Sequence, residues 1–112
     1  MSRARLLPRR QRDDCARAIA ALNALAGDGA VLVATVQRPW ASATFSGFRL
    51  SATFDFPAAA GAGERFCEAL PDHEFTLPRV LVADAVVVWK SRQFVPVDRL
   101  TCRVDLLLLD ED

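Results

Sequence analysis

The chain has 112 residues, of which 52% are hydrophobic and 25% charged, and its fourteen basic residues balance its fourteen acidic ones. This length suits one domain with its own core, and the apolar content excludes a disordered chain. The balanced charge argues against a general polyanion binder, and no apolar run reaches the roughly 20 residues that a membrane-spanning helix needs. No apolar signal-peptide stretch precedes Asp13, so we expect a cytoplasmic protein without a membrane segment.

Residues 1–8 are predicted to form a flexible basic arm, followed by a helix from Arg9 to Ala26. Apolar side chains recur along that helix at steps of three and four residues, the spacing of one helical face. Pro8 suits the start of the helix, and Gly27 suits the position just past its end.

The next segments have the alternating pattern of β-strands. We expect strands over residues 30–37, 40–45 and 48–56, with an interruption at Arg38-Pro39 and a two-residue hairpin turn at Ser46-Gly47. An unbroken strand that passes through Gly47 is the alternative interpretation.

The second half of the chain repeats this order of elements. Glycines make residues 58–63 poor helix material, so the second helix is predicted over residues 64–70 and ends at Pro71-Asp72. A strand then runs from Leu77 or Arg79 to Lys90, and a last strand covers residues 100–109. The short connections favour hairpins and an antiparallel sheet.

These elements predict an α+β fold in a single domain over residues 9–112. The expected architecture is an antiparallel sheet of four to five strands with two helices, in the order α-β-β(-β)-α-β-β.

The segment Val80–Trp89 is apolar on both faces of the strand that it is predicted to form. A strand with one wet face would alternate apolar and polar side chains, so each face of this strand needs a cover. One solution places the two helices on opposite faces of the sheet. We favour a second copy of the protein, in a homodimer through the sheet. The expected interface residues are Val80, Val82, Val86, Val88, Leu107 and Leu109.

Asp84 is the one carboxylate inside this run of valines. A buried carboxylate needs a partner, and Arg103 on the neighbouring predicted strand is the natural one for a cross-strand pair. If the pair is sealed in an interface, it specifies register rather than adding stability. A third possibility is a functional carboxylate with a raised pKa.

His73 is the only histidine and the first candidate for a catalytic acid or base. It lies between Asp72 and Glu74, and Cys67 precedes it by six residues, but no nucleophile motif accompanies it. A solvated surface histidine is the plainer interpretation. An alternative function is therefore a small-molecule-binding protein or enzyme with a pocket between sheet and helix near Asp84, Arg103 and His73. We expect association rather than catalysis.

Two further site types have weaker support. A nucleic-acid-associated protein could use four of the five arginines that precede the first acid, Arg3, Arg5, Arg9 and Arg10, but no reading motif accompanies them. The cysteines Cys15, Cys67 and Cys102 lie far apart in the sequence, without metal-ligand spacing. We expect three buried structural thiols, no metal and no cofactor.

Overall fold

The computed structural model describes residues 8–57 and 60–111. The elements are α1 (Arg9–Ala26), β1 (Val31–Ala41), β2 (Ser46–Phe56), α2 (Ala60–Ala69), the 3-10 helix η1 (Leu70–Asp72), β3 (Val80–Gln93) and β4 (Arg99–Asp110). They confirm the α+β class and the order α-β-β-α-β-β. The predicted arm falls almost entirely on residues 1–7, which lie outside the described residues.

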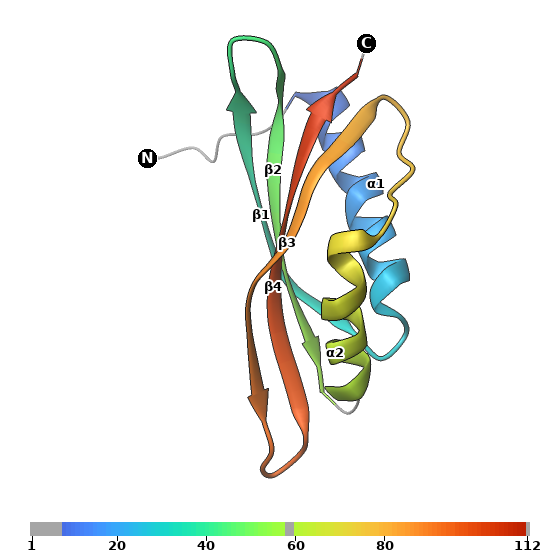
Figure 1. The fold of residues 1–112 in the computed structure, drawn as a ribbon, viewed down its shortest axis with the longest axis vertical. Coiled ribbons are helices and arrows are strands. Elements are labelled where there is room, and N and C mark those ends of the chain that lie inside the picture. The colour runs from blue at the N-terminus through green and yellow to red at the C-terminus, as the bar shows by residue number, and fades with distance from the viewer. Residues whose placement is uncertain (1–7, 58–59, 112) are drawn as a thin grey trace.

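The strands form one antiparallel four-stranded sheet in the order β1-β2-β4-β3. Both helices lie on the same face of this sheet, as Figure 1 shows. The alternative in which the helices take opposite faces is therefore wrong. The other face, called the open face below, has no covering element among the described residues.

The core lies between the two helices and the central strands. The inward side chains of β2 and β4 are fully buried, and α1 contributes Ala18 and Leu22. Three aromatic rings meet at its centre, with Phe66 of α2 lying 5.2 Å from Phe54 and 5.8 Å from Phe56 between ring centroids. The two helices therefore shield this face of the sheet from solvent without any contribution from a second chain.

Helix α1 has the predicted bounds, with Pro8 at its N-cap position and Gly27 after its last residue. Gly27 has a φ of 87°, a left-handed conformation that glycine adopts without steric cost. Its buried face includes Asp14, whose Oδ1 accepts from Nη1 of Arg17 at 3.3 Å.

The first hairpin differs from the prediction. β1 continues through Pro39 to Ala41, and the turn covers residues 42–45 rather than Ser46-Gly47. Proline is tolerated in β1 because this strand lies at the sheet edge, where a missing backbone N–H need not break a ladder. The Ser42 hydroxyl closes the turn by accepting from the backbone N–H of Thr44 and of Phe45.

Gly47 is a close-approach residue within β2 rather than a turn residue. A Cβ atom at this position would lie 1.9 Å from the backbone oxygen of Leu108 on β4. No side chain fits that space, so glycine allows the two central strands to pair here.

Helix α2 begins at Ala60, earlier than the predicted start at residue 64. Of the two glycines that argued against a helix, Gly63 has a packing reason. A Cβ at Gly63 would lie 2.9 Å from Cδ2 of Leu100 and 3.0 Å from Cδ1 of Phe56. The loss in helix propensity is offset by the close approach of α2 to the sheet.

β3 contains two irregularities in its pairing with β4, between Val82 and Asp84 and between Val87 and Trp89. Each β-bulge inserts one extra residue, which moves the following side chains to the other face. The predicted face shared by Val80, Val82, Asp84, Val86 and Val88 is therefore wrong.

Candidate functional site

The open face is apolar along both of its edges. Register assigns to it the residues of β1 and β3 that pair with the outward positions of β2 and β4. The apolar ones among these edge residues are Val31, Ala34, Val36 and Trp40 on β1, and Leu81, Val86 and Trp89 on β3. Val36 and Leu81 are each 50% exposed, and Trp89 is 43% exposed. Large apolar side chains thus meet solvent at both edges.

A polar stripe runs along the centre of the open face, on β2 and β4. Arg99 donates through Nε and Nη2 to the carboxylate of Asp55, which also accepts from the Thr101 hydroxyl at 3.3 Å. Arg103 donates to Oδ1 of Asp105 at 3.3 Å and to the Ser51 hydroxyl at 3.2 Å. These charged and polar groups form hydrogen bonds and ion pairs with one another within the chain. A partner that covered them would therefore not need to supply new hydrogen bonds to them.

Three charged residues of the open face lie in one cross-strand row. Arg38 pairs with Arg49, Arg49 with Leu107, and Leu107 with Asp84, so the row runs across the whole sheet. Within the described residues, none of the three charged side chains forms an ion pair. Two positive charges and one negative charge on this row therefore lack partners within the described chain.

The structure divides the predicted interface residues between the two faces. Val80 and Val82 contact the core on the helix side. Val86 and Leu107 lie on the open face, and Leu109 shares that face although only 8% of it is exposed. Val88 is the extra residue of the second bulge and is 46% exposed. The sequence analysis did not predict the apolar residues of β1, although a signal for them was present: residues 30–36 (AVLVATV), like residues 80–89, are largely apolar on both faces of a strand.

The predicted pair of Asp84 with Arg103 is not formed. The bulges place Asp84 opposite Leu107 and Arg103 opposite Trp89. Arg103 instead pairs along its own strand with Asp105. The pair is not formed because the register of β3 on β4, which the sequence does not specify, places Asp84 opposite Leu107, four residues along β4 from Arg103.

His73 lies at the end of η1, where its backbone N–H donates to the carbonyl oxygen of Leu70. Its ring is exposed and meets Phe75 edge-on at 4.6 Å between centroids. A cavity of about 440 Å³ next to it is lined by His73, Glu74, Phe75, Thr76, Leu81 and Val82. Cys67 is not in this lining, so no thiol nucleophile faces the imidazole there.

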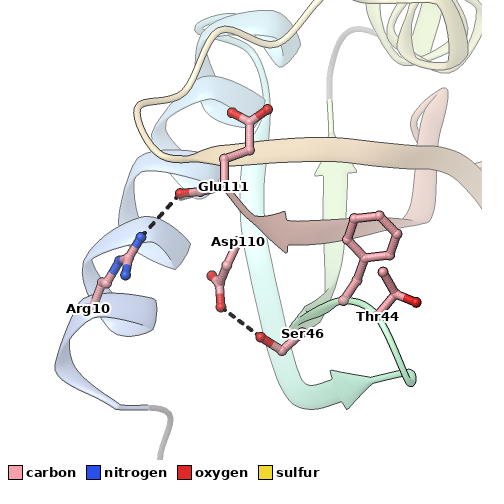
Figure 2. Close-up of a pocket in the computed structure, with 6 residues that line it drawn as sticks. Arg10, Thr44, Ser46, Asp110 and Glu111 are labelled. Carbon is pink, nitrogen blue, oxygen red and sulfur yellow. Dashed lines mark hydrogen bonds between the residues drawn. The ribbon is translucent and has the colours of Figure 1, made fainter.

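The largest of the described cavities, about 590 Å³, lies where α1, the first hairpin and the end of β4 meet. Figure 2 shows Arg10, Ser46, Asp110 and Glu111 around it. Ser46 donates to Oδ2 of Asp110 at 3.2 Å, and Arg10 donates to the backbone oxygen of Glu111 at 3.5 Å. These bonds fasten the end of β4 to α1 and to the hairpin, which is a structural use of the polar groups.

A third cavity, of about 440 Å³, lies between the C-terminal part of α2 and β3. Its lining is mostly apolar and includes Cys67, Lys90 and Trp89. Nζ of Lys90 lies 2.7 Å from Oε1 of Glu64. Cys102 pairs with Lys90 across the sheet, and both Cys102 and Cys67 belong to the buried core cluster. A hydrogen bond with Cys102 is the main cause that lowers the pKa of Cys67. The structure therefore joins two thiols that the sequence separates by 35 residues.

Asp84 and Arg103 line none of these three cavities. Of the three residues predicted to lie near one pocket, only His73 lines one of these cavities. Of the arginines predicted to bind nucleic acid, Arg3 and Arg5 lie outside the described residues, whereas Arg9 and Arg10 are exposed at the start of α1.

Within residues 8–57 and 60–111, no group of three or more His, Cys, Asp or Glu side chains is placed to hold a metal ion. None of the helices in this part of the chain combines the length and the apolar character needed to cross a membrane.

Comparisons with known proteins found no family, no curated protein and no solved structure that matches the chain.

Proposed function

We propose that the protein is a cytoplasmic homodimer that acts by association, in which the open faces of two copies pack against each other. The observation that carries this proposal is that large apolar side chains are exposed on β1 and β3, the two edge strands of that face. Val31, Val36, Leu81, Val86 and Trp89 are each between 39% and 52% exposed. Large exposed apolar side chains that gather on one face of a soluble protein often mark the surface where a partner binds.

The size of the open face suits a stable dimer. With four strands about 4.8 Å apart and about 37 Å long, the face covers about 700 Å² in each copy. A standard protein interface buries about 800 Å² on each partner. Most of the polar stripe is compatible with burial, because Asp55 pairs with Arg99 and Asp105 with Arg103 within the chain, whereas Arg49 has no ion pair within the described residues.

Charge complementarity favours a second copy over an unrelated partner and selects one arrangement. A two-fold axis parallel to the strands, midway between the two sheets, places β3 of each copy over β1 of the other. The cross-strand rows then coincide, so Asp84 meets Arg38 of the second copy. The dimer gains this ion pair twice by symmetry, and it pairs charges that have no ion pair within the described chain.

The alternative two-fold axis, perpendicular to the strands, also brings apolar edges together. It reverses the order of the rows, however, and leaves Asp84 and Arg38 apart. Only the axis parallel to the strands satisfies both the apolar edges and the charged row, so the dimer is expected to use it.

Sedimentation velocity over a range of protein concentrations tests the proposal. We expect the native chain to sediment as a dimer and the Val86→Glu chain as a monomer, because a carboxylate in an apolar contact is costly to desolvate. Ala20→Glu on the exposed side of α1 introduces the same charge off the open face and is expected to remain dimeric. A native chain that is monomeric at every concentration, or a Val86→Glu chain that stays dimeric, would overturn the proposal.

A further inference from the structure

We propose that Cys67 and Cys102 form a reactive dithiol that a small hydroperoxide oxidises to an intramolecular disulfide. The proposal goes beyond the dimer and concerns the cavity between α2 and β3. It starts from the position of Cys67, which is nearly buried, with 7% of it exposed, yet lies in the wall of that cavity.

The cavity gives a small oxidant access to one sulfur and not to the other. Its volume of about 440 Å³ exceeds that of a hydroperoxide many times, and it opens to solvent beside β3. Cys102 is completely buried on the inward side of β4 and is absent from the lining of this cavity. An oxidant therefore reaches Cys67 first, and Cys102 is placed to react with the product.

The surroundings of Cys67 lower its pKa and so favour its thiolate, which is the nucleophilic form. The hydrogen bond from the Cys102 thiol lowers the pKa of Cys67, and the ammonium group of Lys90 lowers it further. Glu64 and Glu68 on α2, together with burial, act in the opposite direction. The pKa of Cys102 is raised by the same hydrogen bond and by its burial, so this sulfur keeps its proton.

The chemistry balances with one hydroperoxide. The thiolate of Cys67 attacks a peroxide oxygen, the O–O bond breaks, and the leaving alkoxide takes up a proton to become an alcohol. Cys67 is then a sulfenic acid. The sulfur of Cys102 attacks it and loses its proton, the S–O bond breaks, and the hydroxide leaves as water. Two thiols and one hydroperoxide thus give one disulfide, one alcohol and one water.

The third cysteine is an internal control. Cys15 is a buried thiol on α1, and its burial raises its pKa. It is absent from the lining of the three cavities. We therefore expect Cys15 to react at least about tenfold more slowly than Cys67.

The experiment exposes the reduced full-length protein to a small excess of hydrogen peroxide. Intact mass spectrometry without reductant is expected to show the loss of two hydrogens, and peptide mapping to find Cys67 joined to Cys102. In the Cys102→Ser chain we expect a sulfenic acid on Cys67, trapped by dimedone. The Cys67→Ser chain should leave Cys102 as a thiol, and the Cys15→Ser chain should behave as the native chain does.

Three results would overturn the proposal: a native chain that keeps all its thiols, a Cys15 that is oxidised as fast as Cys67, or a disulfide that joins two chains. The native chain alone decides the matter if a cysteine variant fails to fold. The Val36→Glu chain, which carries its substitution on β1 away from the cavity, separates this proposal from the dimer. It is expected to be monomeric and still to form the Cys67–Cys102 disulfide.

Discussion

Arg38 and Asp84 lie in the same cross-strand row at opposite edges of the open face, with Arg49 and Leu107 between them. Within one sheet they are three strands apart and cannot meet. A two-fold axis parallel to the strands places Arg38 of each copy next to Asp84 of the other. This relationship makes the proposed dimer testable at the level of single charges.

Reversing either charge is expected to weaken the dimer, and reversing both is expected to restore it. Arg38→Asp or Asp84→Arg places like charges together twice in each dimer, which should raise the dissociation constant by about tenfold to a hundredfold. The double variant should return to within about threefold of the native value, since a swapped pair has the same attraction.

Sedimentation equilibrium gives the dissociation constants for this charge swap. Arg12→Asp on the exposed side of α1 changes the same charge off the open face and is expected to have little effect. Two single variants that weaken the dimer without any recovery in the double variant would contradict the axis parallel to the strands.

The two glycines of α2 are expected to respond to alanine in opposite directions. At Gly63 a methyl group would collide with Leu100 and Phe56, so Gly63→Ala should lower the free energy of unfolding by about 1–3 kcal/mol. At exposed Gly61 the nearest atom is Nη1 of Arg65 at 3.4 Å, so Gly61→Ala should raise it by about 0.5–1 kcal/mol through helix propensity. Urea denaturation followed by circular dichroism measures both. Equal effects of the two substitutions would argue against the close packing of α2 on the sheet.

Arg17 is expected to support the buried carboxylate of Asp14. Asp14 is fully buried, and its Oδ2 has no hydrogen-bond partner within the described residues. Arg17→Ala removes the partner of Oδ1 and should lower the free energy of unfolding by about 1–2 kcal/mol. In an Asp14→Asn background the same substitution should cost less, because no buried charge is then left alone.

Chemical denaturation of the four chains of this double-mutant cycle measures the coupling. Arg12→Ala, on the exposed side of the same helix, is expected to change the free energy of unfolding by less than about 0.5 kcal/mol. Equal costs of Arg17→Ala in both backgrounds would show that the arginine acts only through its own packing.

Lys90 and Glu64 are expected to shift the reactivity of Cys67 with opposite signs. Lys90→Met removes the cation that lowers the pKa of Cys67, so the rise of its alkylation rate should move to higher pH. Glu64→Gln removes an anion that raises this pKa, so the rise should move to lower pH. Lys90→Arg keeps the charge and should keep a profile close to the native one.

The readout for these variants is the rate of iodoacetamide labelling of Cys67 between pH 6 and pH 10, followed by peptide mass spectrometry. Labelling of Cys15 in the same samples reports general loosening of the fold. Identical profiles for the native, Lys90→Met and Glu64→Gln chains would show that the local charges do not control the thiol.

The sequence by itself determined the elements that depend on neighbours along the chain. The three- and four-residue spacing of Cys15, Ile19 and Leu22 predicted α1, and Pro8 and Gly27 marked its ends. The alternating pattern over residues 100–109 predicted β4. Both patterns depend only on the spacing of apolar residues within one helix or strand, which is visible in the sequence itself.

Only the tertiary structure decided which surfaces these elements share. The two bulges of β3, the contact of Gly47 with Leu108 and the meeting of Cys67 with Cys102 each depend on a strand or helix far away in the sequence. A β-bulge moves the side chains that follow it to the other face of the sheet, up to the next bulge. The position of a bulge is set by pairing with the partner strand rather than by the bulged residues themselves. The placement of Asp84 with Arg38 in one row therefore had to come from the paired sheet.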